Sequence, residues 1–315
     1  MDWRLNDRAA ELVLKLPQMT SDLRIQKSEV AGATVYDFGI NTEGGLQAGF
    51  KLAQLCMSGL AEVSLTTTNL NEAAWPAVQV STDHPLAACL LSQYAGWQIG
   101  IGKYFAMGSG PMRAAVGRES VFQKFQYQES PSQTVGILEG RKLPTPEVLT
   151  FISEKTGIPA DKTTLCIAPT ASQAGTVQVV ARVVETALHK LFELGFEIRR
   201  IVSAHGIAPL STIAKDDLTA IGRTNDAILY GGQVTLWVRG DDQSLSEIGP
   251  HVPANGSPSY GRPFLEIFEA AGRDFYKIDP HLFSPARISF QNLDTGKVQT
   301  FGQLNHGVLQ QSFGI

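Results

Sequence analysis

The sequence lacks the features that mark membrane, disulfide-rich secreted or nucleic-acid-binding proteins. No apolar run among its 315 residues approaches the roughly 20 residues that a membrane-spanning helix needs. Its three cysteines, Cys56, Cys89 and Cys166, lie far apart, and an odd number without CxxC spacing argues against a disulfide framework or a zinc site. Lysine and arginine do not cluster, and the formal net charge is -4. We therefore expect a protein of the reducing cytoplasm with no nucleic-acid and no membrane partner.

Sequence signatures of metal and nucleotide binding are also missing. The six histidines are scattered and form neither HxH nor HExxH, so their spacing predicts no metal site. The glycine-rich stretch AMGSGP at 106–111 does not match GxGxxG, and GxxxxGK[ST] does not occur. Nucleotide binding by a Rossmann or P-loop mechanism is not expected. The glycines either expose backbone amides to an anion or form a tight turn.

What is present is a composition that supports a substantial core, with 43% hydrophobic and 18% charged residues. Helical and strand patterns are interspersed without a regular βαβ alternation. We predict an α/β protein with α+β character, built from two mixed-sheet α/β domains with a ligand cleft between them. The predicted domains are residues 1–160 and 161–315, and the chain is free to cross between them more than once.

Local signals place several elements along the chain. Thr145, Pro146 and Gly157 bracket a predicted helix from 146 to 157. Residues 286–291 and 297–301 are predicted to pair as a closing hairpin. Further predictions are a helix at 83–96, one strand at 97–105, a strand at 227–230 and a surface loop at 241–260.

One apolar helix carries an unusual polar stripe. The stretch TVQVVARVVETALHKLFELG is predicted as a single helix that ends near Gly195. Gln178, Arg182, Glu185 and His189 follow one another at offsets of four, three and four, so they share one helix face. An Arg–Glu pair at this spacing is most often a surface ion pair of a few tenths of a kcal/mol. On a largely buried helix it favours a helix that lines a cleft, because buried charges need a partner, a cavity or water.

Four loops combine small residues with isolated polar groups, as ligand sites often do. The first, STDHP at 81–85, is explained equally well by a helix cap at Asp83. The glycine-rich stretch above is the second. The third, GRTNDA at 222–227, also fits an Asx turn at Asn225 and Asp226. The aromatics of the fourth, at 274–287, are more often core residues than a surface for a flat ring.

Taken in order, five segments resemble the methenyltetrahydromethanopterin cyclohydrolase family over nearly the whole chain: STDHPLA, KYFAMGSGP, APTAS…VQVVARVVET, AIGRTNDAILYGG and DFYKIDPHLFSPAR. The resemblance implies a cytoplasmic, homotrimeric enzyme of one-carbon metabolism with two α/β domains. Such enzymes reversibly add water to methenyl-tetrahydromethanopterin to give its 5-formyl derivative, and no metal or redox cofactor takes part. In the family an arginine and a glutamate on one helix hold the hydrolytic water, and the matching positions are Arg182 and Glu185.

We expect Glu185 to act as a general base on water and Arg182 to orient it. An anionic part of the substrate is expected at the AMGSGP amides or at Lys277. Two other functions stay open at this point: formyl or one-carbon transfer with the same pterin, and pterin binding without catalysis. The predicted substrate contacts are small or polar residues and one aromatic: Asp83, His84, Phe105, Gly108, Ser109, Gly110, Thr170, Ser172, Gln178, Asn225, Asp226, Lys277 and Asp279.

Overall fold

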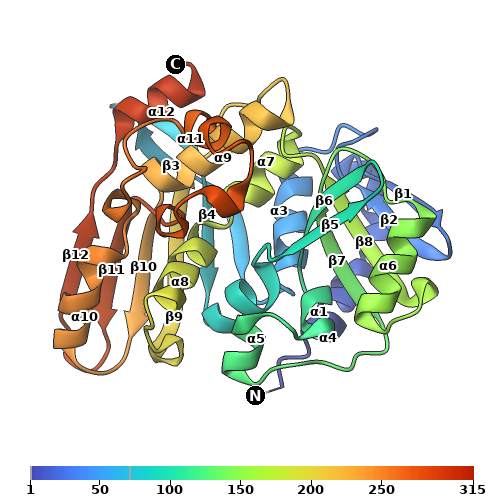
Figure 1. Ribbon diagram of the computed structural model, residues 1–315, viewed down its shortest axis with the longest axis horizontal. Coiled ribbons are helices and arrows are strands. Elements are labelled where there is room, and N and C mark those ends of the chain that lie inside the picture. Colours follow the sequence, from blue (N-terminus) through green and yellow to red (C-terminus); the bar gives the residue numbers. More distant parts are fainter. Residues whose placement is uncertain (1, 71) are drawn as a thin grey trace. The chain divides into compact units, whose positions relative to one another are not determined.

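The computed structural model describes residues 2–70 and 72–315, which form two compact units (Figure 1). Unit 1 comprises Met1–Ala61 and Ala87–Gln178, and unit 2 comprises Glu62–Leu86 and Val179–Ile315. The chain changes unit after residues 61, 86 and 178. The sequence analysis placed a boundary after residue 160 and left further crossings open. Each unit holds a six-stranded mixed sheet, which confirms the predicted α/β class. Among the described residues, no helix has the length and hydropathy of a membrane span.

The sheet of unit 1 has the order β1-β2-β8-β7-β6-β5. Its strands are β1 (Gln26–Val30), β2 (Ala33–Asp37), β5 (Trp97–Ile101), β6 (Tyr104–Ser109), β7 (Thr134–Glu139) and β8 (Thr163–Ala168). Strands β2, β8 and β7 are parallel neighbours, so their carboxyl ends lie at one edge of the sheet. The single strand predicted at 97–105 is two strands, because Gly102 (φ +57°) and Lys103 form a turn between them. Much of the AMGSGP stretch therefore lies in β6 and not in a loop.

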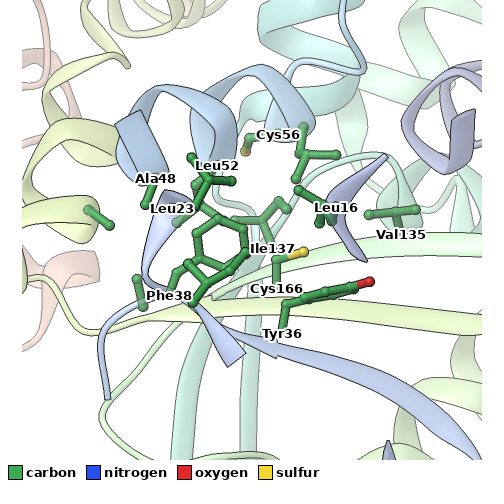
Figure 2. Packing of buried hydrophobic residues seen from close by; sticks show 14 of the residues in the cluster. Leu16, Leu23, Tyr36, Phe38, Ala48, Leu52, Cys56, Val135, Ile137 and Cys166 are labelled. Carbon is green, nitrogen blue, oxygen red and sulfur yellow. The ribbon is translucent and has the colours of Figure 1, made fainter. Parts of the chain in front are cut away.

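Helices cover both faces of this sheet. The helices of unit 1 are α1 (Leu5–Val13), α2 (Thr20–Leu23), α3 (Leu46–Cys56), α4 (Met112–Val116), α5 (Ser120–Phe125), α6 (Pro146–Thr156) and α7 (Gln173–Val180). Leu52 of α3 packs with Ile137 in the buried cluster that Figure 2 shows. On the opposite face, Ile152 of α6 packs in a cluster with Leu138. Helix α6 confirms the prediction made from its Thr145 and Gly157 boundaries.

The helix predicted at 83–96 is present at Leu86–Gln93, but its hydrogen bonds are unusual. Leu86–Gln93 is a π-helix, and just beyond it the Tyr94 N–H donates to the Cys89 carbonyl at 2.9 Å, five residues earlier. π-Helical turns are rare and often occur near functional sites.

The sheet of unit 2 has the order β12-β11-β10-β9-β4-β3. Its strands are β3 (Glu62–Leu70), β4 (Ala73–Thr82), β9 (Ile201–Pro209), β10 (Gln233–Val238), β11 (Arg287–Asn292) and β12 (Val298–Gly302). Its helices are α8 (Val183–Glu193), α9 (Asp217–Gly231), α10 (Asp242–Ile248), α11 (Phe264–Ala270) and α12 (His306–Phe313). Strands β11 and β12 pair antiparallel, which confirms the predicted hairpin.

Only one face of this sheet is apolar within the described residues. Leu236 and Phe290 are fully buried, and they alternate along β10 and β11 with the half-buried polar residues Thr235 and Ser289. Such alternation is typical of a sheet with one face on the core and one toward solvent. Helices α8 and α9 pack on strand β9.

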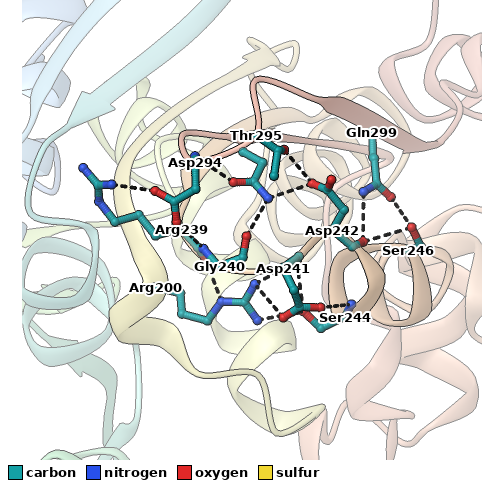
Figure 3. Close-up of polar contacts among 11 residues, drawn as sticks. Arg200, Arg239, Gly240, Asp241, Asp242, Ser244, Ser246, Asp294, Thr295 and Gln299 are labelled. Atoms are coloured by element: carbon teal, nitrogen blue, oxygen red, sulfur yellow. Dashed lines mark hydrogen bonds and ion pairs between the residues drawn. The ribbon is translucent and has the colours of Figure 1, made fainter.

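The surface loop predicted at 241–260 contains helix α10 and two short 3-10 turns, Gly249–His251 and Ala254–Gly256. The Asp241 carboxylate accepts the Ser244 N–H at 2.7 Å and so caps α10. Asp294, in the β11–β12 connection, accepts the Gly240 N–H at 2.8 Å. Figure 3 shows how these bonds join the start of α10 to the hairpin. The prediction missed α10 because its capping residues resemble loop composition.

The loop predicted at 222–227 and the strand predicted at 227–230 are both wrong. Helix α9 runs through the whole stretch, and Asp216 caps it by accepting the Thr219 N–H at 2.9 Å. The Asn225 amide donates to the Ile221 carbonyl at 2.8 Å, within its own helix and not in an Asx turn. Small and turn-favouring residues here occupy the interior of a helix that is held by tertiary contacts.

Candidate active site

The single helix predicted around Arg182 is two helices. Helix α7 ends at Val180 and α8 begins at Val183, while the Arg182 N–H donates to the Val179 carbonyl at 3.0 Å. Gln178 therefore belongs to α7 and Glu185 to the first turn of α8, so the predicted continuous stripe is wrong. No glycine or proline marks the junction, which is why sequence periodicity did not predict it.

Arg182 and Glu185 nevertheless remain neighbours. Their side chains are only 8% and 6% exposed, and Arg182 Nη1 lies 3.7 Å from Glu185 Oε2. This is a buried pair and not the surface ion pair that the spacing most often indicates. The separation exceeds hydrogen-bond length and has the range at which one water molecule can contact both groups. His189, by contrast, lies 3.7 Å from the 44% exposed carboxylate of Glu193, farther along α8.

A glycine positions the first turn of α8. A Cβ atom at Gly206 of β9 would lie 2.7 Å from Cγ2 of Val184 and 2.8 Å from Cγ1 of Val183. Both valines are completely buried. Glycine at this point therefore lets the start of α8 pack directly on the sheet, and this close approach fixes the backbone that carries Arg182 and Glu185.

A second group of predicted residues gathers in unit 1. Ser109 Oγ lies 3.3 Å from Cys56 Sγ, and Gln178 Nε2 lies 3.8 Å from the same sulfur. Ser109 and Gln178 are each 2% exposed, so both are as buried as Arg182 and Glu185. Gly108 precedes Ser109 in β6. The N–H of Gly110 donates to the Ser92 carbonyl at 2.9 Å, so this amide is not free for the predicted anion.

Thr170, another predicted residue, contacts the carboxylate of Glu139, which was not predicted from the sequence. The Thr170 hydroxyl donates to Oε1 of Glu139. Glu139 ends β7 and Thr170 follows β8, so the parallel pairing of these strands brings them together. Ser172 has a different role, because its Oγ accepts the Gly175 N–H at 3.0 Å in the first turn of α7. The sequence signal for Glu139 was its position as the single acidic residue at the end of the apolar strand TVGILE.

Asp83 and His84 lie in unit 2 and are exposed. Asp83 Oδ1 accepts a hydrogen bond from Ser203 Oγ at 2.6 Å. The His84 N–H donates to Thr82 Oγ1 at 2.9 Å.

Asp226 is fully buried in unit 2, and its carboxylate links three helices by hydrogen bonds. Its Oδ1 accepts the Phe264 N–H at 2.8 Å and its Oδ2 accepts from Ser312 Oγ at 2.6 Å. Burial raises the pKa of Asp226 to about 7, although both hydrogen bonds act to lower it. These contacts join α9 to the start of α11 and to α12, and they give Asp226 a structural role.

The 274–287 segment is anchored by a lysine that the sequence analysis also missed. Lys190 of α8 is 3% exposed, and its Nζ donates to the His281 carbonyl at 2.6 Å. Burial lowers the pKa of Lys190 to about 8. Burial acts to raise the pKa of Asp279, but hydrogen bonds from Ser257 and the His281 N–H outweigh it and the pKa is lowered. The Lys277 side chain is 68% exposed.

The predicted residues thus fall into separate groups within each unit. In unit 1, Ser109 and Gln178 both contact Cys56, and Thr170 contacts Glu139, while Arg182 and Glu185 form the buried pair of unit 2. In the part of the chain that the structure describes, no group of three or more His, Cys, Asp or Glu side chains is arranged to hold a metal ion.

Comparison with known proteins gives consistent matches along the chain. Residues 4–313 match the family model described as "Cyclohydrolase (MCH)". Three relatives carry the name methenyltetrahydromethanopterin cyclohydrolase. The protein of Methanococcoides burtonii is 39% identical over 314 residues, 99% of this chain and 98% of the relative. That of Rhodopirellula baltica is 43% identical over 291 residues (91% and 87%), and that of Methylobacillus flagellatus is 42% identical over 312 residues (98% and 95%).

Proposed function

Because this chain belongs to the methenyltetrahydromethanopterin cyclohydrolase family, we propose that it reversibly hydrolyses 5,10-methenyl-tetrahydromethanopterin to 5-formyl-tetrahydromethanopterin. The substrate is a cation whose bridging carbon lies between two nitrogens and is already electrophilic. The enzyme has to supply a positioned water and a base. The observation that carries the proposal is the buried pair of Arg182 and Glu185, with its charged atoms 3.7 Å apart.

In the proposed mechanism Glu185 is the base. Its carboxylate removes a proton from water as the water oxygen bonds to the bridging carbon. The resulting neutral adduct then loses its bond to one nitrogen, and Glu185 returns its proton to that nitrogen. The hydroxyl proton of the adduct leaves to solvent as the formyl C=O forms on the other nitrogen. The reaction consumes one water and releases one proton, and as written it needs no metal or redox cofactor.

Arg182 has an electrostatic and an orienting role in this proposal. Its positive charge favours the ionised form of the neighbouring carboxylate, which burial alone would disfavour. Its planar guanidinium also presents several N–H donors in fixed directions, so it can hold the attacking water or the developing oxygen charge. A buried carboxylate beside a cationic substrate further stabilises binding.

The substrate-binding role of the other predicted residues is also part of the proposal. We assign it chiefly to Ser109, Thr170 and Gln178, with Gly108 and Phe105 on the same strand as Ser109. Asp226 is omitted, since both of its carboxylate oxygens are already engaged. A homotrimer in the cytoplasm is the proposed assembly and location.

The test is hydrolysis of purified methenyl-tetrahydromethanopterin, followed by the loss of methenyl absorbance. Glu185→Gln keeps the shape of the side chain but removes its basicity, so we expect kcat to fall by roughly 10²–10⁴-fold. The matched control is Glu193→Gln on the exposed side of the same helix, which should leave kcat unchanged.

Each outcome bears on a different part of the proposal. Equal kcat for the wild type and Glu185→Gln would remove Glu185 from the mechanism. Binding of the pterin with stable methenyl absorbance would indicate a binding protein without catalysis. Loss of absorbance only in the presence of an added one-carbon acceptor would indicate a transferase.

A further inference from the structure

We propose that Glu139, together with Phe105 and Met107, forms the surface that recognises the flat pterin ring of the substrate. In this proposal the carboxylate accepts hydrogen bonds from the ring amide N–H and from the adjacent exocyclic amino group. The inference rests on the proposed function and names a residue set for substrate recognition that is separate from the Arg182–Glu185 pair.

The position of Glu139 in the sheet is the first argument. It is the last residue of β7, paired with Ala168 of the parallel strand β8 and with Met107 of the antiparallel strand β6. In α/β sheets, ligands usually bind beyond the carboxyl ends of parallel strands, where the strand direction or order changes. Strand β7 lies at such a change, because its neighbour β8 is parallel and its neighbour β6 is antiparallel.

The second argument is the composition of this face. Phe105 and Met107 are two residues apart on β6 and so point to the same side as Glu139, the cross-strand partner of Met107. Tyr104 and Ala106 point to the other side, into the core that α6 covers. Phe105 is 58% exposed, an unusual state for a large aromatic ring. An exposed aromatic ring, a thioether and a carboxylate at its edge suit a flat heterocycle with donors along one side.

The third argument is charge. Glu139 is half-buried, and in the described part of the chain no lysine or arginine forms a salt bridge with it. Its Oε1 accepts from the Thr170 hydroxyl, and Thr170 is in turn held by Thr176, whose Oγ1 donates to the Thr170 carbonyl at 2.9 Å. One side of the carboxylate is thus fixed within the protein. An uncompensated, partly buried carboxylate is costly, and a ligand that brings donors relieves this cost.

The chemistry of the ring supplies the specificity. A pterin ring carries an amide N–H and an amino group side by side, and two parallel donors match the two oxygens of one carboxylate. In the corresponding 2,4-dioxo ring a carbonyl replaces the amino group, so an acceptor would face the carboxylate. Glu139 therefore predicts discrimination between these two rings.

The test compares the wild type with Glu139→Gln by the KM and kcat for methenyl-tetrahydromethanopterin. Separately, calorimetry measures the binding of tetrahydromethanopterin and of its 2,4-dioxo counterpart. We expect the variant to raise KM by about 10- to 100-fold, to change kcat far less, and to lose most of the preference for the amino-substituted ring. Glu29→Gln, on the exposed edge strand β1 of the same sheet, is the control and should leave KM unchanged.

A second variant keeps the test decisive if Glu139→Gln does not fold. Phe105→Ala changes an exposed side chain and should raise KM severalfold with little change in kcat. An unchanged KM for both variants in an enzyme that hydrolyses the substrate would overturn this inference and leave the proposed function standing. A fall in kcat at constant KM would also overturn it. Glu139-dependent ring selectivity in a protein without hydrolysis would support the inference and reject the proposed function.

Discussion

Among the described residues, each unit has an arginine–glutamate pair whose arginine is buried, and the two pairs are built differently. In unit 1 the Arg113 side chain is inaccessible to solvent, and its Nε donates to Glu119 Oε1 at 2.9 Å while Nη2 contacts Glu119 Oε2. The same guanidinium donates to the Ser92 carbonyl at 3.2 Å and lies over the rings of Tyr94 and Phe122, 5.1 and 5.2 Å from their centroids. In unit 2 the charged atoms of Arg182 and Glu185 are 3.7 Å apart.

The difference separates a structural pair from a candidate catalytic one. A bidentate pair that also contacts carbonyls and aromatic faces is closed, because its donors already have partners within the protein. The charged atoms of Arg182 and Glu185 lie beyond hydrogen-bond distance of each other, at a junction between two helices, and at 3.7 Å one further group can contact both. Burial alone would not distinguish the two pairs, since both arginines are buried.

The largest expected effect lies in the closed pair. Glu119→Gln leaves the Arg113 charge buried without its counter-charge, and we expect a loss of about 3–5 kcal/mol in the free energy of unfolding. The kcat per folded molecule should not change. Urea titration and activity of the same samples measure both quantities. Asp7→Asn in the exposed Arg4–Asp7 pair is the control and should cost less than about 1 kcal/mol. A large loss of kcat in Glu119→Gln would contradict the assignment of this pair as structural.

Asp226 extends the comparison to a buried carboxylate whose pKa is raised. Its pKa rises to about 7 in the folded state from 3.8, so the unfolded chain loses this proton first as pH rises. The contribution of Asp226 to the stability of the wild type should therefore fall between about pH 4 and 7, by up to about 4 kcal/mol, and this contribution should be absent in Asp226→Asn. Denaturant titrations across that pH range measure the difference between the two proteins.

Asp241→Asn is the control of opposite sign for this pH dependence. The backbone and side chain of Ser244 lower the pKa of Asp241 in the folded state, so this carboxylate stabilises the fold more as pH rises. Its replacement should therefore become more destabilising with rising pH. A constant difference between Asp226→Asn and the wild type at every pH would rule out the titration of Asp226.

Substitutions in the Arg182–Glu185 pair should lower mainly kcat. Arg182→Lys keeps the positive charge but loses the planar donor fork, and we expect kcat to fall by roughly 10²-fold. The free energy of unfolding should change less than in Glu119→Gln. Steady-state kinetics and urea titration of the two variants side by side give the comparison. Wild-type kcat in Arg182→Lys would limit the role of Arg182 to its charge.

The smallest expected effect tests what positions the Arg182–Glu185 pair. Gly206→Ala places a methyl group against Val183 and Val184, and we expect a loss of about 1–3 kcal/mol in stability and a reduced kcat as α8 shifts. Gly100→Ala on β5 is the control, because a Cβ there meets nothing within 4 Å. Its stability should stay within about 0.5 kcal/mol of the wild type.

Those parts of the fold that have local boundary signals could be predicted from the sequence. Helix α6 begins after Thr145 and ends at Gly157, which adopts the left-handed conformation with φ +74° that glycine tolerates best. The hairpin of β11 and β12 was likewise marked by turn residues. Helix α9 was not predicted, because long-range contacts such as that of Asp226 with Phe264 hold it. The α7–α8 junction was not predicted, because no glycine or proline marks it.

In the candidate site, too, the sequence predicted local contacts but not those between residues far apart in the chain. The proximity of Arg182 and Glu185 follows from an i, i+3 spacing, so the sequence predicted it correctly even though the helix was not continuous. Glu139 and Thr170 are 31 positions apart, and only the pairing of β7 with β8 brings them together. Lys190 was missed for a related reason, since its partner is the carbonyl of His281, 91 positions away.

The interleaving of the two units along the chain imposes an order on biosynthesis. When the ribosome has released residue 178, every segment of unit 1 has been delivered. At that moment the β3–β4 hairpin has emerged without β9, the strand that pairs with β4 from Ala77 to Thr82. The nascent chain therefore carries an unpaired strand edge until residues 201–209 follow, and this interval is when a chaperone or premature aggregation would act on it.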